Sequence, residues 1–189
     1  MTDPTVPPTQ PPPMGDRREP SLVLVNTGDG KGKSTAAFGT AIRGVARGWK
    51  VGVVQFLKSG DWSVGEEKVG RGLGIEWWAL GDGFTWDSSD MEETEAIARE
   101  AWRMAKERIE SGEYDLLVLD EITYPINWGW IEIDDILATI QNRPERLNLI
   151  ITGRDAPPAL VEVADTVTEM KKVKHAFDKG VMARRGIDY

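Results

Sequence analysis

Short apolar runs alternate with amphipathic or small-residue stretches along most of the chain. Continuous apolar runs, which are typical of strands buried on both faces of a sheet, predict strands at 22–25, 51–56, 75–80, 116–119, 147–152 and 166–170. Apolar residues at helical spacing, or stretches of small residues, predict helices near 34–47, 89–110, 134–142 and 158–164, with a short helix within 57–74. The alternation predicts right-handed strand–helix–strand units. We therefore expect an α/β fold with three layers, in which helices cover a mostly parallel sheet.

The first 20 residues differ from the rest of the chain because they lack this periodicity. They hold seven of the eleven prolines, a composition typical of an extended or disordered segment. The pattern predicts a Pro-rich flexible tail at 1–20 and one domain at 21–189. No apolar run approaches the roughly 18 residues of a membrane span, and no signal-peptide pattern is present. We expect a cytoplasmic protein that has no membrane partner.

Composition narrows the classes of function. The formal net charge is -8 and the sequence pI is about 4.8, which disfavours nucleic acid as a partner because duplex binding depends on Lys and Arg. The chain has no cysteine, so thiol catalysis, disulfides and Cys-ligated metals are excluded. His175 is the single histidine, so a His-cluster metal site is excluded as well. We interpret it as a structural residue.

A glycine-rich turn follows the first apolar run and precedes the first helix. It reads T-G-D-G-K-G-K-S at 27–34, and the phosphate-loop pattern is G-x-x-x-x-G-K-[ST]. Thr27 replaces the first glycine, but the glycines that let backbone N–H groups face phosphate oxygens remain. We expect Mg-ATP to bind here, with Lys33 on the phosphates and Ser34 on Mg²⁺. The predicted fold class is therefore the P-loop NTPase-like, RecA-like fold. The ATP-binding residues that we predict in and after the loop are Thr27, Gly28, Asp29, Gly30, Lys31, Gly32, Lys33, Ser34 and Thr35.

Two acids end the apolar run 116–119. In P-loop proteins an acid at this position holds Mg²⁺, which makes Asp120 and Glu121 candidate metal residues together with Ser34. The alternative is an acidic strand end that faces solvent. A phosphate loop with an acidic strand end indicates a nucleotide but not a reaction, so a kinase, an ATPase and a nucleotidyl or adenosyl transferase all stay open at this point.

Several segments resemble the P-loop ATP:corrinoid adenosyltransferases, the family that acts on cob(I)alamin and cob(I)yrinic acid a,c-diamide. The resemblance covers about residues 22–189. Its segments are T-G-D-G-K-G-K-S-T-A-A-F-G-T-A at 27–41, V-G-V-V-Q-F at 51–56, G-F-T-W at 83–86, V-L-D-E-I-T-Y at 118–124, I-I-T-G-R at 150–154, V-K-H-A-F-D-K-G-V from 173, and the final G-I-D-Y.

The resemblance implies that Co(I) of a corrinoid attacks C5′ of ATP and that triphosphate leaves. It implies catalytic roles for Lys33, Phe84 and Trp86, the two aromatics displacing the corrinoid's lower axial base. It also implies that Arg43 lies near the nucleotide and that the protein is a homodimer, with an electron-donating reductase or flavoprotein as a further partner. In relatives an N-terminal helix can cover the partner's nucleotide, and the prolines of the tail depart from that pattern.

Two other functions are alternatives to adenosyl transfer. The first is a P-loop kinase or ATPase, which would release ADP or phosphate without a corrinoid. The second is a nucleotide-gated corrinoid carrier, which would bind a corrinoid without alkylating cobalt. Four tryptophans, Trp77, Trp78, Trp128 and Trp130, stay open between core packing and the wall of a flat ligand.

Overall fold

One parallel sheet forms the centre of the molecule. The computed structural model describes residues 19–57, 65–80 and 91–188. Within these residues the strand order is β3-β2-β4-β5-β1-β6, and each neighbouring pair is parallel. The strands are β1 (Val23–Thr27), β2 (Val51–Gln55), β3 (Glu76–Ala79), β4 (Leu116–Asp120), β5 (Asn148–Thr152) and β6 (Thr166–Glu169). The expectation of a mostly parallel sheet is confirmed.

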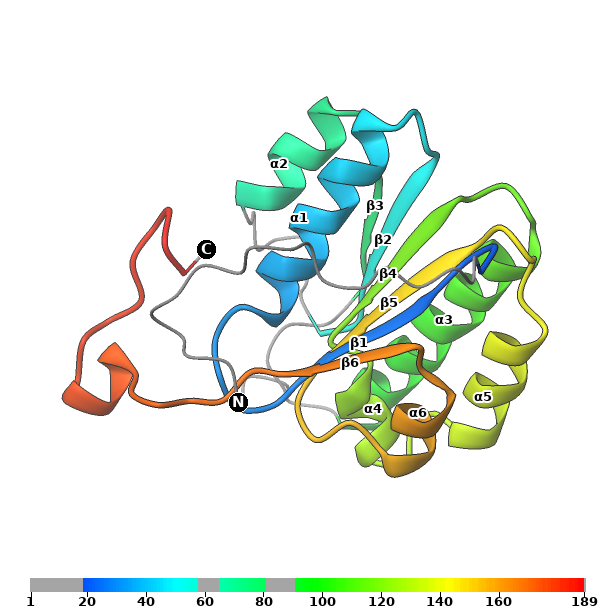
Figure 1. Cartoon of the computed structure of the whole chain (residues 1–189). Helices are drawn as coiled ribbons and strands as arrows, with labels where there is room; N and C mark the ends of the chain where they lie inside the picture. The colour runs from blue at the N-terminus through cyan, green and yellow to red at the C-terminus, as the bar shows by residue number, and fades with distance from the viewer. Residues whose placement is uncertain (1–18, 58–64, 81–90, 189) are drawn as a thin grey trace, which may run out of the picture.

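Helices cover both faces of this sheet. In Figure 1, α1 and α2 lie on one face, and α3, α5 and α6 lie on the other. The helices are α1 (Lys33–Ala46), α2 (Gly65–Gly72), α3 (Met91–Glu110), α4 (Thr123–Asn127), α5 (Ile133–Gln141) and α6 (Pro158–Val163), with a 3-10 helix η1 (Ala176–Lys179). The predicted three-layer P-loop NTPase-like fold is confirmed. No helix within the described ranges is both long and apolar enough to cross a membrane.

The central strands are apolar on both faces because each face is covered by helices. Side chains alternate along each strand, so one set packs toward α1 and the other toward α3 and α5. Phe38 of α1 shares a buried cluster with Val53, Val118 and Ile150. The opposite, larger cluster contains the neighbouring strand residues together with residues of α3, α5 and α6, among them Val54, Leu119, Ile151, Ile109, Ile136 and Leu160.

The strand order fixes where loops meet. Strand β5 lies between β1, which leads into the phosphate loop, and β4, which ends in the acid pair. Parallel strands end at the same edge, so the segments after β1, β4 and β5 converge there.

The predicted helices and strands are found with bounds that differ by one or two residues. Gly48 follows α1 as predicted. The end of this helix has the two hydrogen bonds of a Schellman motif, from Trp49 N–H to Gly44 O and from Gly48 N–H to Val45 O. The short helices α4 and η1 were not predicted.

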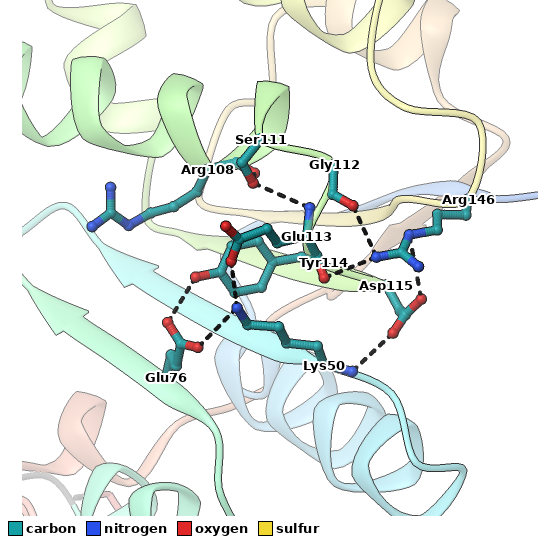
Figure 2. Close-up of polar contacts among 9 residues, drawn as sticks. All are labelled: Lys50, Glu76, Arg108, Ser111, Gly112, Glu113, Tyr114, Asp115 and Arg146. Atoms are coloured by element: carbon teal, nitrogen blue, oxygen red, sulfur yellow. Dashed lines mark hydrogen bonds and ion pairs between the residues drawn. The ribbon is translucent and has the colours of Figure 1, made fainter.

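Polar side chains close the opposite, amino-terminal edge of β2, β3 and β4 (Figure 2). Lys50 forms ion pairs with Glu113 at 2.6 Å and Glu76 at 3.3 Å. The buried Tyr114 donates its hydroxyl proton to Glu76 at 2.7 Å. The Lys50 ammonium lies 4.6 Å from the centre of the Tyr114 ring. This edge is therefore held by ionic contacts and is distant from the loops where the candidate site lies.

Candidate functional site

The glycine-rich turn connects the carboxyl end of β1 to the amino end of α1. Gly28 and Gly32 have positive φ values of 92° and 119°. Helix α1 then begins at Lys33, with the backbone N–H of Ala36 bonded to the carbonyl of Gly32 at 2.8 Å. The free N–H groups of a helix amino terminus and its positive dipole end favour an anion at this place. The local geometry is therefore that of a phosphate loop.

The loop packs against the chain that leaves β6. The N–H of Gly30 donates to the carbonyl of Met170 at 2.5 Å, and the N–H of Met170 donates to the carbonyl of Thr27 at 2.8 Å. A Cβ on Gly30 would lie 2.6 Å from the Met170 carbonyl oxygen. Close packing against the backbone of Met170 thus requires glycine at this position.

Lys33 lies at the centre of the loop. Its ammonium donates to the carbonyls of Gly28 at 2.6 Å and Gly30 at 2.8 Å. Burial lowers the pKa of Lys33 below its ordinary value of 10.5, and the charge of Arg154 lowers this pKa further. The carboxylates of Glu121, Asp29 and Asp120 act in the opposite direction. The acid pair after β4 is therefore close enough to Lys33 to affect its titration.

A hollow of about 290 Å³ opens beside the loop. Positive side chains from three parts of the chain line it, although the protein as a whole is acidic: Lys31 and Lys33 from the loop, Arg154 from the segment after β5, and Lys172 from the segment after β6. The other lining residues are Asp29, Gly30, His175, Phe177 and Asp178. This concentration of positive charge suits a polyphosphate. Arg154 and Lys172 were not predicted as site residues.

The two acids after the apolar run have different surroundings. Asp120, the last residue of β4, is fully buried. Glu121 has a φ of 67°, which is uncommon for a residue other than glycine, and its N–H donates to the hydroxyl oxygen of Thr152 at 2.9 Å. Backbone strain of this kind is found mostly where function requires it. The two neighbours thus combine one buried carboxylate with one strained, half-buried residue.

The donor set fits a small, hard cation. Ser34 lies in the first turn of α1, beside Lys33, and offers a hydroxyl oxygen. Mg²⁺ takes oxygen ligands, usually one or two carboxylates with nucleotide phosphates and waters. Ser34, Asp120 and Glu121 offer oxygen atoms of this kind. Among the described residues no group of three or more His, Cys, Asp or Glu forms a candidate metal cluster.

Some predicted residues lie further along α1 than the loop or outside the described residues. Thr35 directly follows Ser34 and is exposed on the first turn of α1. Arg43 lies about 15 Å further along the helix than Lys33, at 1.5 Å per residue. The Arg43 guanidinium donates to the Thr40 hydroxyl at 2.9 Å. Phe84 and Trp86 lie outside the described residues.

The open question of the tryptophans is answered in part. Trp77 is buried against Phe38, with ring centres 4.9 Å apart, and belongs to the core. Trp78 stacks edge-on with Tyr114 and lies under the guanidinium of Arg108, away from the loop. Rings of Tyr124, Trp128 and Trp130 form a chain with centres 5.7 Å and 4.6 Å apart. Trp128 is 40% exposed, so this last group keeps a surface that a flat ligand could contact.

The C-terminal segment returns to the loop. Lys31 forms an ion pair with Asp188 at 2.8 Å, which lowers the pKa of Asp188. His175 accepts a hydrogen bond at Nδ1 from the N–H of Phe177, while Asp178 accepts one from the N–H of His175. The histidine therefore caps η1, in keeping with the structural role expected for it.

Comparison with known proteins identifies relatives of the whole described chain. The sequence model of the family described as ATP:corrinoid adenosyltransferase BtuR/CobO/CobP matches residues 19–189. The chain is 44% identical over 171 residues to a corrinoid adenosyltransferase of Escherichia coli (strain K12), covering 90% of this chain and 87% of that protein. It is 43% identical over 175 residues to a corrinoid adenosyltransferase of Pseudomonas aeruginosa, covering 92% and 86%. It is 41% identical over 173 residues to the corrinoid adenosyltransferase CobA of Salmonella typhimurium, covering 92% and 88%.

Proposed function

The chain belongs to the ATP:corrinoid adenosyltransferase family BtuR/CobO/CobP, and from this we propose that it transfers the 5′-deoxyadenosyl group of ATP to a corrinoid. The observation that carries the proposal is the phosphate loop at 27–34, with its basic hollow, in a chain whose residues 19–189 match the family model. Co(I) of the corrinoid attacks C5′ of ATP, the bond from C5′ to the triphosphate oxygen breaks, and triphosphate leaves. The product is an adenosylated corrinoid, as cobalamin biosynthesis requires.

The chain's own residues would act mainly on the leaving group. As C5′ is attacked, negative charge grows on the bridging oxygen of the triphosphate. The loop N–H groups, the amino end of α1 and the ammonium of Lys33 would stabilise this charge. Arg154 and Lys172 line the same hollow, and we add them to the residues that contact the triphosphate. No general base is needed because the nucleophile carries no proton.

Mg²⁺ is part of the proposal. Ser34, Asp120 and Glu121 would hold it, because they offer the oxygen ligands that this cation prefers. When bound, the cation neutralises charge on the triphosphate and fixes its orientation. The protein's task is then to keep C5′ within attack distance of the corrinoid. Thr35 and Arg43 stay predicted nucleotide contacts.

Phe84 and Trp86 are proposed to act on the corrinoid. Aromatic rings on the lower face of the corrin would displace the axial base without coordinating cobalt. Loss of an axial donor lowers the acceptor orbital of Co(II) and eases its reduction to Co(I), because axial ligands tune a metal's potential. The electron would come from a separate reductase or flavoprotein.

We also propose that the protein is cytoplasmic and that it is a homodimer. Light scattering of the purified protein would test the homodimer.

An absorbance time course without oxygen tests the proposed reaction. Chemically reduced cob(I)alamin, Mg²⁺ and ATP are mixed with the protein, and the Co(I) band is followed together with the phosphate products. We expect loss of the band, a light-sensitive alkylcobalamin spectrum and one triphosphate per cobalt. A Lys33→Met variant is the matched control and should slow the change. Release of ADP or phosphate that does not depend on corrinoid would indicate the kinase or ATPase alternative instead.

A further inference from the structure

A row of polar side chains crosses the sheet where its strands end. Gln55 of β2 and Asp120 of β4 are register partners, and Thr152 ends the next strand, β5. All three are fully buried. The residues two positions earlier, Val53, Val118 and Ile150, belong to the apolar cluster under α1. The row is thus the last layer of the α1 face, and it replaces an apolar layer with buried polar groups.

Hydrogen bonds join this row into one chain. The indole N–H of Trp77 donates to Oε1 of Gln55 at 2.8 Å, and Nε2 of Gln55 donates to Oδ2 of Asp120 at 2.9 Å. On the other side, the hydroxyl of Thr152 donates to Oδ1 of Asp120 at 2.7 Å and accepts from the N–H of Glu121 at 2.9 Å. Each oxygen of the Asp120 carboxylate therefore accepts from a different neighbouring strand.

The direction of each bond is determined by chemistry. An indole N–H can only donate, so the amide oxygen of Gln55 must face Trp77 and its NH₂ group must face Asp120. A backbone N–H can also only donate, so the Thr152 hydroxyl accepts from Glu121 and its own proton is free for Asp120. The donors on both sides therefore converge on one carboxylate. A flipped Gln55 amide would lose both of its bonds.

From this convergence we infer that Gln55 and Thr152 are positioning residues that fix the Asp120 carboxylate for Mg²⁺, with Trp77 ordering Gln55. The inference rests on the proposed metal role of Asp120. Two donors on opposite oxygens fix the plane of the carboxylate and therefore the direction in which its oxygens would meet a cation. Thr152 also holds the backbone of Glu121 in its strained conformation. One hydroxyl thereby sets the geometry of both proposed metal residues.

The test is the coupling between Mg²⁺ and ATP in equilibrium binding, without corrinoid. ATP affinity is measured by calorimetry with saturating Mg²⁺ and with EDTA. The ratio of the two affinities measures how much Mg²⁺ strengthens ATP binding. Residues that orient metal ligands usually contribute 10- to 100-fold to metal affinity. We expect Thr152→Val and Gln55→Leu to reduce the ratio by about tenfold and to leave affinity in EDTA unchanged.

Matched variants separate positioning from folding. Thr152→Ser keeps the hydroxyl and should keep the ratio, and Trp77→Phe, which loses the N–H, should give a smaller loss than Gln55→Leu. Thr139 is a buried threonine on α5 whose hydroxyl bonds Asp135 O at 2.7 Å. Thr139→Val removes a comparable bond outside the row and should not change the ratio.

The Asp120→Asn variant distinguishes two kinds of failure. If it lowers the ratio, and Gln55→Leu adds no further loss in its background, the inference holds. If Asp120→Asn lowers the ratio but Gln55→Leu and Thr152→Val do not, the positioning role is wrong while the metal assignment stands. If Asp120→Asn leaves the ratio unchanged, the metal assignment and the positioning role both fail. Equal losses with Mg²⁺ and with EDTA in the Gln55 and Thr152 variants would reduce their role to general packing.

Discussion

The hydroxyl oxygen of Thr27 accepts a hydrogen bond from the backbone N–H of Ala156 at 3.1 Å, although 129 positions separate the two residues. Thr27 is the position at which the loop departs from the usual glycine. The bond ties the start of the phosphate loop to the segment after β5, which carries Arg154. The threonine that replaces the usual glycine therefore has a structural role in this chain.

Replacing Thr27 by Val keeps the shape of the side chain and removes the acceptor. The N–H of Ala156 would lose its partner, and we expect the free energy of unfolding to fall by about 1 kcal/mol. Urea denaturation measures the change. Thr27→Ser retains the hydroxyl and should retain most of the stability, so an equal loss in both variants would contradict the assigned bond.

Gly153→Ala should destabilise the protein severely. Gly153 has a φ of 146°, and an added Cβ would lie 1.9 Å from the Thr123 hydroxyl oxygen. Forcing atoms into a packed site at an unsuitable φ costs about 3 kcal/mol, which thermal unfolding would detect. Thr123→Ala removes the nearest clashing atom and should recover part of the loss in the double variant. If the losses of stability in the two single variants simply add in the double variant, the clash with Thr123 must be relieved by movement elsewhere in the structure.

The ATP affinity should depend on pH through Lys33. A lysine attracts phosphate only while protonated, and burial together with Arg154 lowers the pKa of Lys33 from 10.5. We therefore expect affinity to fall as pH rises toward 10.5, starting at a lower pH than for an ordinary lysine. Titration calorimetry across this range measures the fall. Arg154→Gln removes one cause of the lowered pKa and should move the fall to higher pH, whereas Lys33→Met should remove its early onset.

Tyr114 should resist ionisation in the folded protein. Burial, then its hydrogen bond to Glu76, raises the pKa of Tyr114 to about 12 from 10.0. Because the folded state keeps the phenol proton longer than the unfolded state does, stability is retained below pH 10 and declines between pH 10 and about 12. The ultraviolet absorbance of phenolate, taken as the difference between the protein and its Tyr114→Phe variant, gives the pKa. A midpoint near 10 would contradict the buried environment.

Changing Phe84 and Trp86 together to Ala should affect the two cobalt states differently. If the aromatics ease reduction by displacing the axial base, turnover from Co(II) corrinoid with a reductant should fall at least about tenfold more than turnover from pre-formed Co(I), which is about 1.4 kcal/mol of activation free energy. The anaerobic absorbance assay measures both rates. Equal losses would show that the rings bind the corrinoid without acting on its axial ligand.

The apolar runs predicted the strands well because every central strand is covered on both faces, which leaves a continuous apolar signal. The helix α4 was missed because it has only five residues, contains Pro125 and follows directly on the acid pair. Periodicity carries no information on strand order, so the position of β5 between β1 and β4 could not be derived. Helix α1 was predicted because its small residues and its loop have local signatures.

The sequence predicted those residues of the candidate site that stand in short motifs along the chain. Lys33, Asp120 and Glu121 each stand in a recognisable run of residues. Arg154 and Lys172 were missed because a single basic residue after a strand is common, and only the sheet brings the two to the loop. The hydrogen bonds of Gln55 depend on register between β2 and β4, which no pattern along one chain shows. The segment I-I-T-G-R was noted, yet nothing in it indicated that its threonine would contact both acids.

The ion pair between Lys31 and Asp188 has a practical consequence for protein production. A purification tag fused at the carboxyl terminus would begin two residues beyond Asp188, beside a side chain that holds the phosphate loop. The added mass and charge of such a tag would then lie close to the phosphate loop. Kinetic constants measured with the tag would therefore differ from those of the untagged chain.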